Sequence, residues 1–148
     1  MSHHVERVLI GSIQVGDLVW CKLGIFFIVN SIDVLSRTLI NHIQLRNMKN
    51  RKLVIQYDKT FVLRASQEAT QTTITVREVP LSQIRLDDVV WSCEGQDWLQ
   101  VKNIRKHETI DNDKESTREV TKLELNGDDD YPLSPFLEGE PDLIVLVK

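Results

Sequence analysis

The chain has 148 residues, a mass of 17.1 kDa, and contents of 41% apolar and 27% charged residues. That composition supports one ordinary domain or two very small ones and excludes a disordered tail. No uninterrupted apolar run is longer than the five residues 25–29, whereas a spanning helix needs roughly 20. We therefore expect a protein without a membrane span.

Targeting, cofactor and catalytic signals are weak throughout. Glu6 and Arg7 interrupt the stretch that would be apolar in a signal peptide, which favours a cytoplasmic location. Two cysteines, Cys21 and Cys93, are too few for a disulfide scaffold or a four-thiolate zinc site. The acidic run at 111–122 lacks the turn glycine and closing glutamate of a calcium loop. Phosphate loops and nucleophile signatures are absent, so we expect no cofactor, no metal and no enzymatic activity.

The net charge of −4 conceals a strong asymmetry between the halves. Residues 1–76 carry nine basic and five acidic side chains, whereas residues 77–148 carry nine and seventeen. Such a split predicts that the halves meet different partners, or that one half of one copy meets the other half of another copy. Acidic surface that serves solubility alone is the competing interpretation.

An internal repeat is visible at a spacing of 71 residues. Residues 5–20 fall on residues 76–91 without a gap, with six identities in sixteen positions where chance gives about one. One inserted residue then aligns 26–32 with 98–104, and later segments align 43–45 with 123–125 and 61–63 with 144–146. The identities are Val5/Val76, Val8/Val79, Ile13/Ile84, Asp17/Asp88, Val19/Val90 and Trp20/Trp91. The pattern predicts a tandem duplication.

Each copy is expected to consist of short strands. Runs rich in branched and aromatic residues cover 18–20, 26–29, 39–45, 53–57 and 61–63, and no helical stripe competes with them. Gly24 can supply a positive φ to the first hairpin, and Gly95 is expected to do so in the second copy. Asp17 and Asp88 precede a strand, where a carboxylate can accept backbone N–H bonds and close a turn.

Five short strands per copy are too few for a two-sheet sandwich, so a small bent barrel is the expected closure. We predict an all-β chain of two tandem five-stranded barrels, with boundaries at 1–65, a linker at 66–75 and 76–148. Trp20 and Trp91 are expected to lie in the barrel cores.

A resemblance supports this architecture. The segment from Gly16 through Asp17 and Trp20 to Lys22, followed by Gly24 and an aromatic pair, resembles the opening of Tudor and PWWP domains. These domains are small barrels of the Src-homology-3 type (SH3-like), and the same entry is similar to the KOW-type barrel. The resemblance implies a small barrel that acts as a binding module.

The segment between the third and fourth predicted strands of the first copy is basic. Four cations in seven residues can contact phosphates, and neighbouring aromatic rings can stack on bases, as small barrels grip single strands. The candidate nucleic-acid-binding residues are Arg46, Lys49, Arg51, Lys52, Phe26, Phe27 and Tyr57. An ordinary polar loop is the alternative, because loops are commonly charged without a ligand.

In the second copy the corresponding candidates are acidic. Asp128, Asp129 and Asp130 repel phosphate and suit a basic protein surface, and Trp98 beside Asp97 can anchor a protein partner. We therefore expect a non-enzymatic adaptor whose first copy contacts nucleic acid or a ribonucleoprotein. The alternative is a protein-interaction module or inhibitor whose second copy covers a basic surface of a larger nucleic-acid-handling machine.

Overall fold

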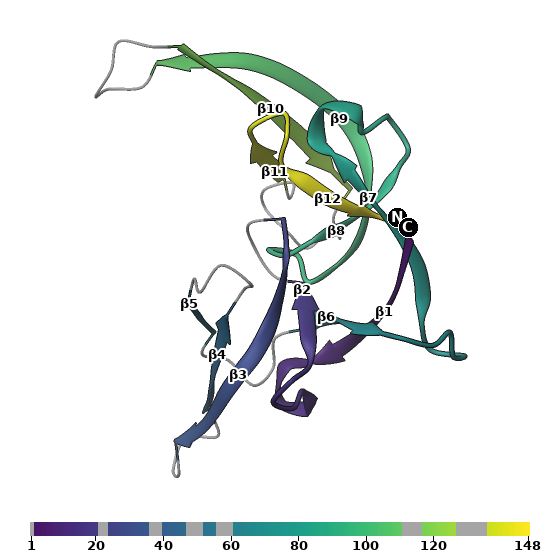
Figure 1. Cartoon of the computed structure of the whole chain (residues 1–148). Coiled ribbons are helices and arrows are strands. Elements are labelled where there is room, and N and C mark those ends of the chain that lie inside the picture. The colour runs from purple at the N-terminus through teal and green to yellow at the C-terminus, as the bar shows by residue number, and fades with distance from the viewer. Residues whose placement is uncertain are drawn as a thin grey trace. The chain divides into compact units, whose positions relative to one another are not determined.

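The computed structural model describes residues 2–20, 24–35, 40–46, 52–55, 61–110, 117–126 and 136–148. It divides into two compact units, residues 2–76 and 77–148 (Figure 1). Within the described ranges, no helix has the length and apolar character needed to cross a membrane. The structure is all-β with antiparallel strands, so the predicted fold class is confirmed at this level.

The first unit is described by six strands and a short 3-10 helix, η1 (Ile10–Ser12). The strands are β1 (Ser2–Leu9), β2 (Leu18–Trp20), β3 (Phe26–Leu35), β4 (Ile40–Arg46), β5 (Lys52–Ile55) and β6 (Phe61–Ser66). The predicted linker, residues 66–75, covers the last residue of β6, the following turn and the first two residues of the next strand.

The second unit repeats this sequence of elements. A 3-10 helix, η2 (Leu81–Gln83), again follows the first strand, which carries the chain across the boundary between the units. The strands are β7 (Ile74–Pro80), β8 (Val89–Ser92), β9 (Asp97–Ile110), β10 (Thr117–Leu125), β11 (Phe136–Gly139) and β12 (Ile144–Val147).

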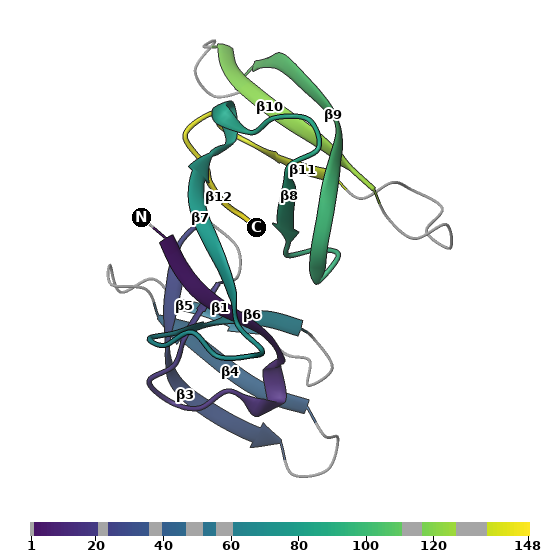
Figure 2. The same ribbon diagram turned by 90° about the vertical axis from the view of Figure 1, so that its right-hand side faces the viewer.

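The two units have the same strand order. It runs β1-β6-β2-β3-β4-β5 in the first and β7-β12-β8-β9-β10-β11 in the second. Figure 2 shows the last strand of each unit beside the first. Among the described ladders none joins β5 to β1 or β11 to β7, so each order is open. The predicted closure into five-stranded barrels is therefore not observed, and each unit has a sixth strand.

The sequence pattern did not predict the additional strands β1 and β7, and there is a physical reason for this. In β1 the apolar residues Val5 and Val8 are three apart, with charged residues between them, so the strand period of two is lost. Only Val5 is fully buried, while Val8 packs at the margin of the core. Backbone pairing with β6, from His4 to Leu9, forms the strand in spite of this pattern.

Each unit has its own apolar cluster, and each described member of the first has a counterpart in or against the second. The first contains Ile10, Ile13, Val19, Phe27, Val29 and Val62, with Val8 packed against it. The second contains, at the repeat-related positions, Leu81, Ile84, Val90, Val101 and Val145, with Val79 and Leu99 packed against it. Leu123, Leu125 and Val147 complete the second cluster. Burial of these side chains supplies most of the stabilising free energy of each unit.

The two repeated indoles are buried, as predicted, but on the other face of their strands. Trp20 and Trp91 are 3% and 2% exposed. They alternate with Val19 and Val90, which point into the clusters, so the indoles lie outside those cores. Both indoles are thus buried as predicted, but neither belongs to the apolar cluster of its unit, and an apolar run on both faces does not reveal this from the sequence.

A carboxylate closes the turn before the second strand of each unit. The backbone N–H of Gln14 donates to Asp17 Oδ2 at 2.8 Å, and that of Arg85 donates to Asp88 Oδ2 at 2.9 Å. The turn is then fastened to the third strand, because Val29 N–H donates to the Asp17 carbonyl and Val101 N–H to that of Asp88. The structural role predicted for both aspartates is confirmed.

Left-handed backbone conformations also recur. Gly16 has a φ of 96° and its counterpart Asp87 a φ of 70°; Gly24 has a φ of 71° and its counterpart Gln96 a φ of 57°. The predicted use of Gly24 is confirmed. The second hairpin differs from expectation, because Gln96 rather than Gly95 adopts the left-handed conformation.

Replacing Asp87 by glycine should stabilise the chain. A residue with a side chain costs roughly 1 kcal/mol in this conformation, and glycine removes that cost. We expect Asp87→Gly to raise the free energy of unfolding in urea by about 1 kcal/mol and Gly16→Ala to lower it by about the same amount. A control, Leu86→Gly, has no positive φ to relieve and should destabilise; stabilisation by both glycine variants would contradict the explanation.

Candidate functional site

Both predicted binding segments leave their units at equivalent places. The end of each unit at which β3 or β9 begins is termed its loop end. In the first unit Arg46, the last residue of β4, pairs with Ile28, the third residue of β3. The connection from β4 to β5 therefore leaves at the loop end, as does the connection from β2 to β3.

The register of the first unit places basic positions in one row with an exposed apolar side chain. Ile28 pairs with Arg46, and Arg46 pairs with Lys52 across β4 and β5. Ile28 is 38% exposed, and Ile25 in the preceding turn is 36% exposed. Like charges at directly opposite positions destabilise a sheet, so nothing in the stability of this hairpin requires two cations there.

The remaining basic candidates, Lys49 and Arg51, belong to the connection between β4 and β5 and lie outside the described residues, as does Tyr57. Lys49 and Arg51 lie in the sequence between Arg46 and Lys52, two positions of the row that Ile28 also joins. The structure thus brings together the strand positions that flank the predicted basic loop.

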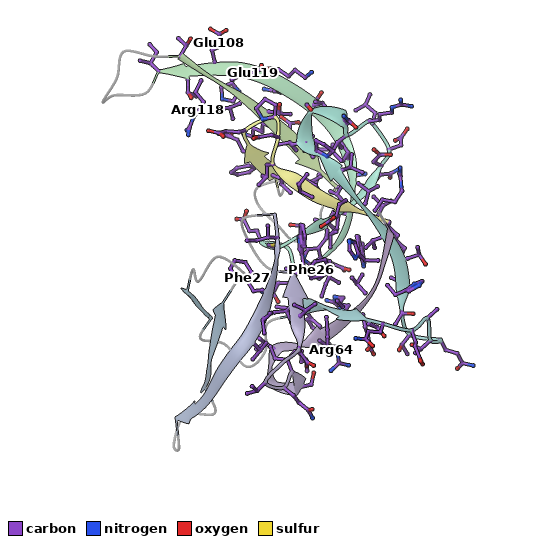
Figure 3. All side chains as sticks on the ribbon, viewed as in Figure 1. Phe26, Phe27, Arg64, Glu108, Arg118 and Glu119 are labelled. Atoms are coloured by element: carbon purple, nitrogen blue, oxygen red, sulfur yellow. The ribbon has the colours of Figure 1, made fainter. Side chains whose placement is uncertain are left out.

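The two predicted aromatic residues have different environments (Figure 3). Phe27 is fully buried in the apolar cluster, so the prediction that its ring stacks on a base is wrong. Phe26 lies on the opposite face and is half-buried. Its ring meets Trp20 edge-on at 5.0 Å between centroids, and His3 at 5.3 Å. His3 is thus part of β1 and of this aromatic group.

In the second unit Trp98 occupies the position of Phe26. It pairs in register with Trp91, and the two rings meet edge-on at 5.5 Å, as Phe26 and Trp20 do in the first unit. Trp98 is half-buried, and within the described part of the chain its buried Nε1 has no hydrogen-bond partner. A buried N–H without a partner costs about 1–3 kcal/mol.

The acidic candidates Asp128, Asp129 and Asp130 lie outside the described residues, in the connection between β10 and β11. That connection is the counterpart of the basic one in the first unit. Asn126 N–H donates to the Gln100 carbonyl at 2.9 Å, which places the end of β10 level with the start of β9. Both loop ends therefore combine an aromatic side chain with a charged connection, of opposite sign in the two units.

Other cations of the first unit are engaged within it. Arg64 Nη2 lies 3.0 Å from Glu6 Oε2 and its Nη1 lies 3.9 Å from Asp17 Oδ2. The guanidinium of Arg7 lies 3.6 Å above the ring of Phe61. These contacts fasten β1, β6 and the turn at Asp17 to one another, so Arg64 and Arg7 serve the fold and are not counted with the loop end.

The described residues contain no group of three or more His, Cys, Asp or Glu side chains placed to hold a metal ion. Comparison of the chain with protein-family models, with curated proteins and with solved structures finds no match. The resemblance to Tudor and PWWP domains therefore depends on the short segment around Asp17 and Trp20.

Among the described residues, the indole nitrogen of Trp98 has no hydrogen-bond partner, so the two tryptophans of the second unit should respond differently to substitution. We expect Trp98→Phe to cost less than about 0.5 kcal/mol in unfolding free energy, because removing an unpaired buried donor offsets the lost ring contact. Trp91→Phe, at a fully buried ring, should cost about 1–2 kcal/mol. Equal losses in urea unfolding would show that the Trp98 N–H is satisfied.

Proposed function

We propose that the two units are copies of one small Src-homology-3-type, Tudor-like barrel that have diverged in charge. Three features support a common origin. The strand orders correspond one to one, the described members of the first apolar cluster have counterparts in the second, and the same carboxylate closes the same turn. Independent evolution of all three in the same order along the chain is a poor explanation of the pattern.

The function that the geometry supports best is non-enzymatic binding of single-stranded nucleic acid at the loop end of the first unit. The carrying observation is the row of Ile28, Arg46 and Lys52, which begins two residues along β3 from the half-buried Phe26. Non-specific single-strand binders combine cations that follow the backbone with apolar and aromatic surfaces for the bases. Ile25 and Ile28 extend that surface, and the sequence alone did not single them out.

Neutralising the basic connection should abolish most of this binding. We expect Lys49→Ala/Arg51→Ala/Lys52→Ala to weaken binding of a labelled single-stranded oligonucleotide in a mobility-shift assay. Each phosphate contact contributes about −0.7 to the slope of log K against log salt, so three lost contacts should flatten it by about 2.

The matched control is Arg77→Ala/Arg85→Ala/Lys148→Ala, which removes three exposed cations from the second unit. It changes the net charge equally and should leave both affinity and salt slope nearly unaltered. Equal losses in the two triple variants, or no shift of the intact chain at low salt, would reject the proposed site.

A second candidate function follows from Trp98. Its half-buried ring lies at the loop end from which the connection that carries Asp128–Asp130 departs, which favours a protein partner with a basic surface. Tryptophan with neighbouring charge is typical of interface anchors. In this role the second unit would cover a cationic surface of a larger nucleic-acid-handling machine, while the first contacts the nucleic acid.

Neutralising the acidic connection tests this role. We expect Asp128→Asn/Asp129→Asn/Asp130→Asn to weaken binding of a fluorescent arginine-rich peptide about tenfold at low salt, through lost electrostatic attraction. The control, Glu119→Gln/Glu138→Gln/Asp142→Asn, removes three exposed acids elsewhere in the same unit and should have little effect. Peptide affinity that follows net charge alone, and so falls equally in both variants, would contradict a specific site.

A further inference from the structure

The outer part of β9 has a neighbouring strand on one side only. β8 pairs with residues 97–100, whereas β10 pairs on the other edge from Val101 to Ile110. Within the described part of the chain no ladder covers the first edge beyond residue 101. Figures 1 and 2 show β9 and β10 continuing together as a long two-stranded ribbon. A strand edge of this length is a template for pairing with another chain.

The ribbon carries an unfavourable charge arrangement. Glu108 and Glu119 face each other across β9 and β10, and both are exposed. No ion pair joins either carboxylate to another described residue. Figure 3 shows Arg118 on the opposite side of the ribbon from Glu108, in agreement with the register, so Arg118 does not compensate the pair. Like charges in this arrangement destabilise the ribbon.

One face of β9 is self-complementary. Ile104, Lys106, Glu108 and Ile110 are spaced by two along that face; Ile104 is half-buried and packs against the second apolar cluster, whereas the other three are exposed. Ile110 is 73% exposed, the most exposed of the described large apolar side chains. When two copies of this segment run antiparallel, apolar positions face apolar positions and each basic position faces an acidic one.

We propose that residues 104–110 of β9 pair with the same segment of a second copy, antiparallel about a two-fold axis at His107. In this register Lys106 of each copy faces Glu108 of the other, and Ile104 faces Ile110. Each Glu108 gains a cation on the side away from Glu119, and each Ile110 gains an apolar neighbour. Main-chain hydrogen bonds along the two edges join the copies in an isologous contact.

The register follows from parity and charge. In an antiparallel pair, residues directly opposite each other project to the same side of the sheet. An axis between two residues would place residues of opposite sides against each other, so the two-fold axis has to pass through a residue. An axis at Lys106 would set Ile104 against Glu108, and an axis at Glu108 would set Lys106 against Ile110. Only the axis at His107 joins opposite charges and apolar side chains at once.

Reversing single charges tests the pairing. Sedimentation equilibrium of the full chain over a range of concentrations should show a monomer–dimer equilibrium, weak because a single strand pair buries little area. We expect Lys106→Glu and Glu108→Lys each to weaken dimerisation at least about tenfold, since each sets like charges opposite. The double variant Lys106→Glu/Glu108→Lys exchanges the charges and should restore the dimer.

Thermal unfolding separates this effect from misfolding. Glu108→Lys replaces the Glu108–Glu119 repulsion with an attraction, so it should keep or raise the melting temperature while it weakens the dimer. A chain that stays monomeric at millimolar concentration, a dimer insensitive to the single reversals, or a double variant that is not restored would each overturn the proposal.

Cross-linking checks the axis independently. In a Cys21→Ser/Cys93→Ser background, His107→Cys places two thiols directly opposite, at the Cα separation of about 4.5–5.5 Å that suits a disulfide. Lys106→Cys places them on the diagonal and should cross-link poorly. Efficient cross-linking at 106 with none at 107 would contradict the axis.

Discussion

The whole arrangement depends on a turn that is closed by a carboxylate and fastened to the following hairpin. The side chains of Asp17 and Asp88 each accept a backbone N–H from three residues upstream, and the carbonyl of each accepts a backbone N–H from the third strand. That second bond sets the register of the second and third strands. A shift of one residue would exchange the buried and exposed faces along the whole hairpin, so the turn decides which side chains form the core.

Fixing that register also fixes where binding residues can lie. Phe26 and Trp98 are held beside Trp20 and Trp91 at the beginning of the third strand. The connection between the fourth and fifth strands leaves at the same end in both units. One framework thus presents the same combination twice, with a basic connection in the first unit and an acidic one in the second. Divergence in the loops leaves the cores almost unchanged, which is typical of folds whose function resides in their loops.

Much of this framework could be predicted from the sequence, because the two copies of the repeat share the residues that determine the structure. The paired aspartates, the strand at 18–20 and the all-β class follow from that comparison. The strands β1 and β7 could not be predicted, since their apolar period is not that of a strand. The face of the indoles was also hidden, because Val19 and Trp20 are both apolar and both buried. Glu108 and Glu119 become neighbours only through the register of β9 and β10, which no local pattern reveals.

The most direct measurement is a titration of the isotopically labelled chain with a single-stranded oligonucleotide, followed by amide chemical shifts. If the first unit binds nucleic acid, the shifts should concentrate at the first loop end, around Phe26, Ile28, Arg46 and Lys52, with the amides near Trp98 unaffected. Shifts centred on the second unit, or spread evenly over both units, would contradict the assignment of nucleic-acid binding to the first.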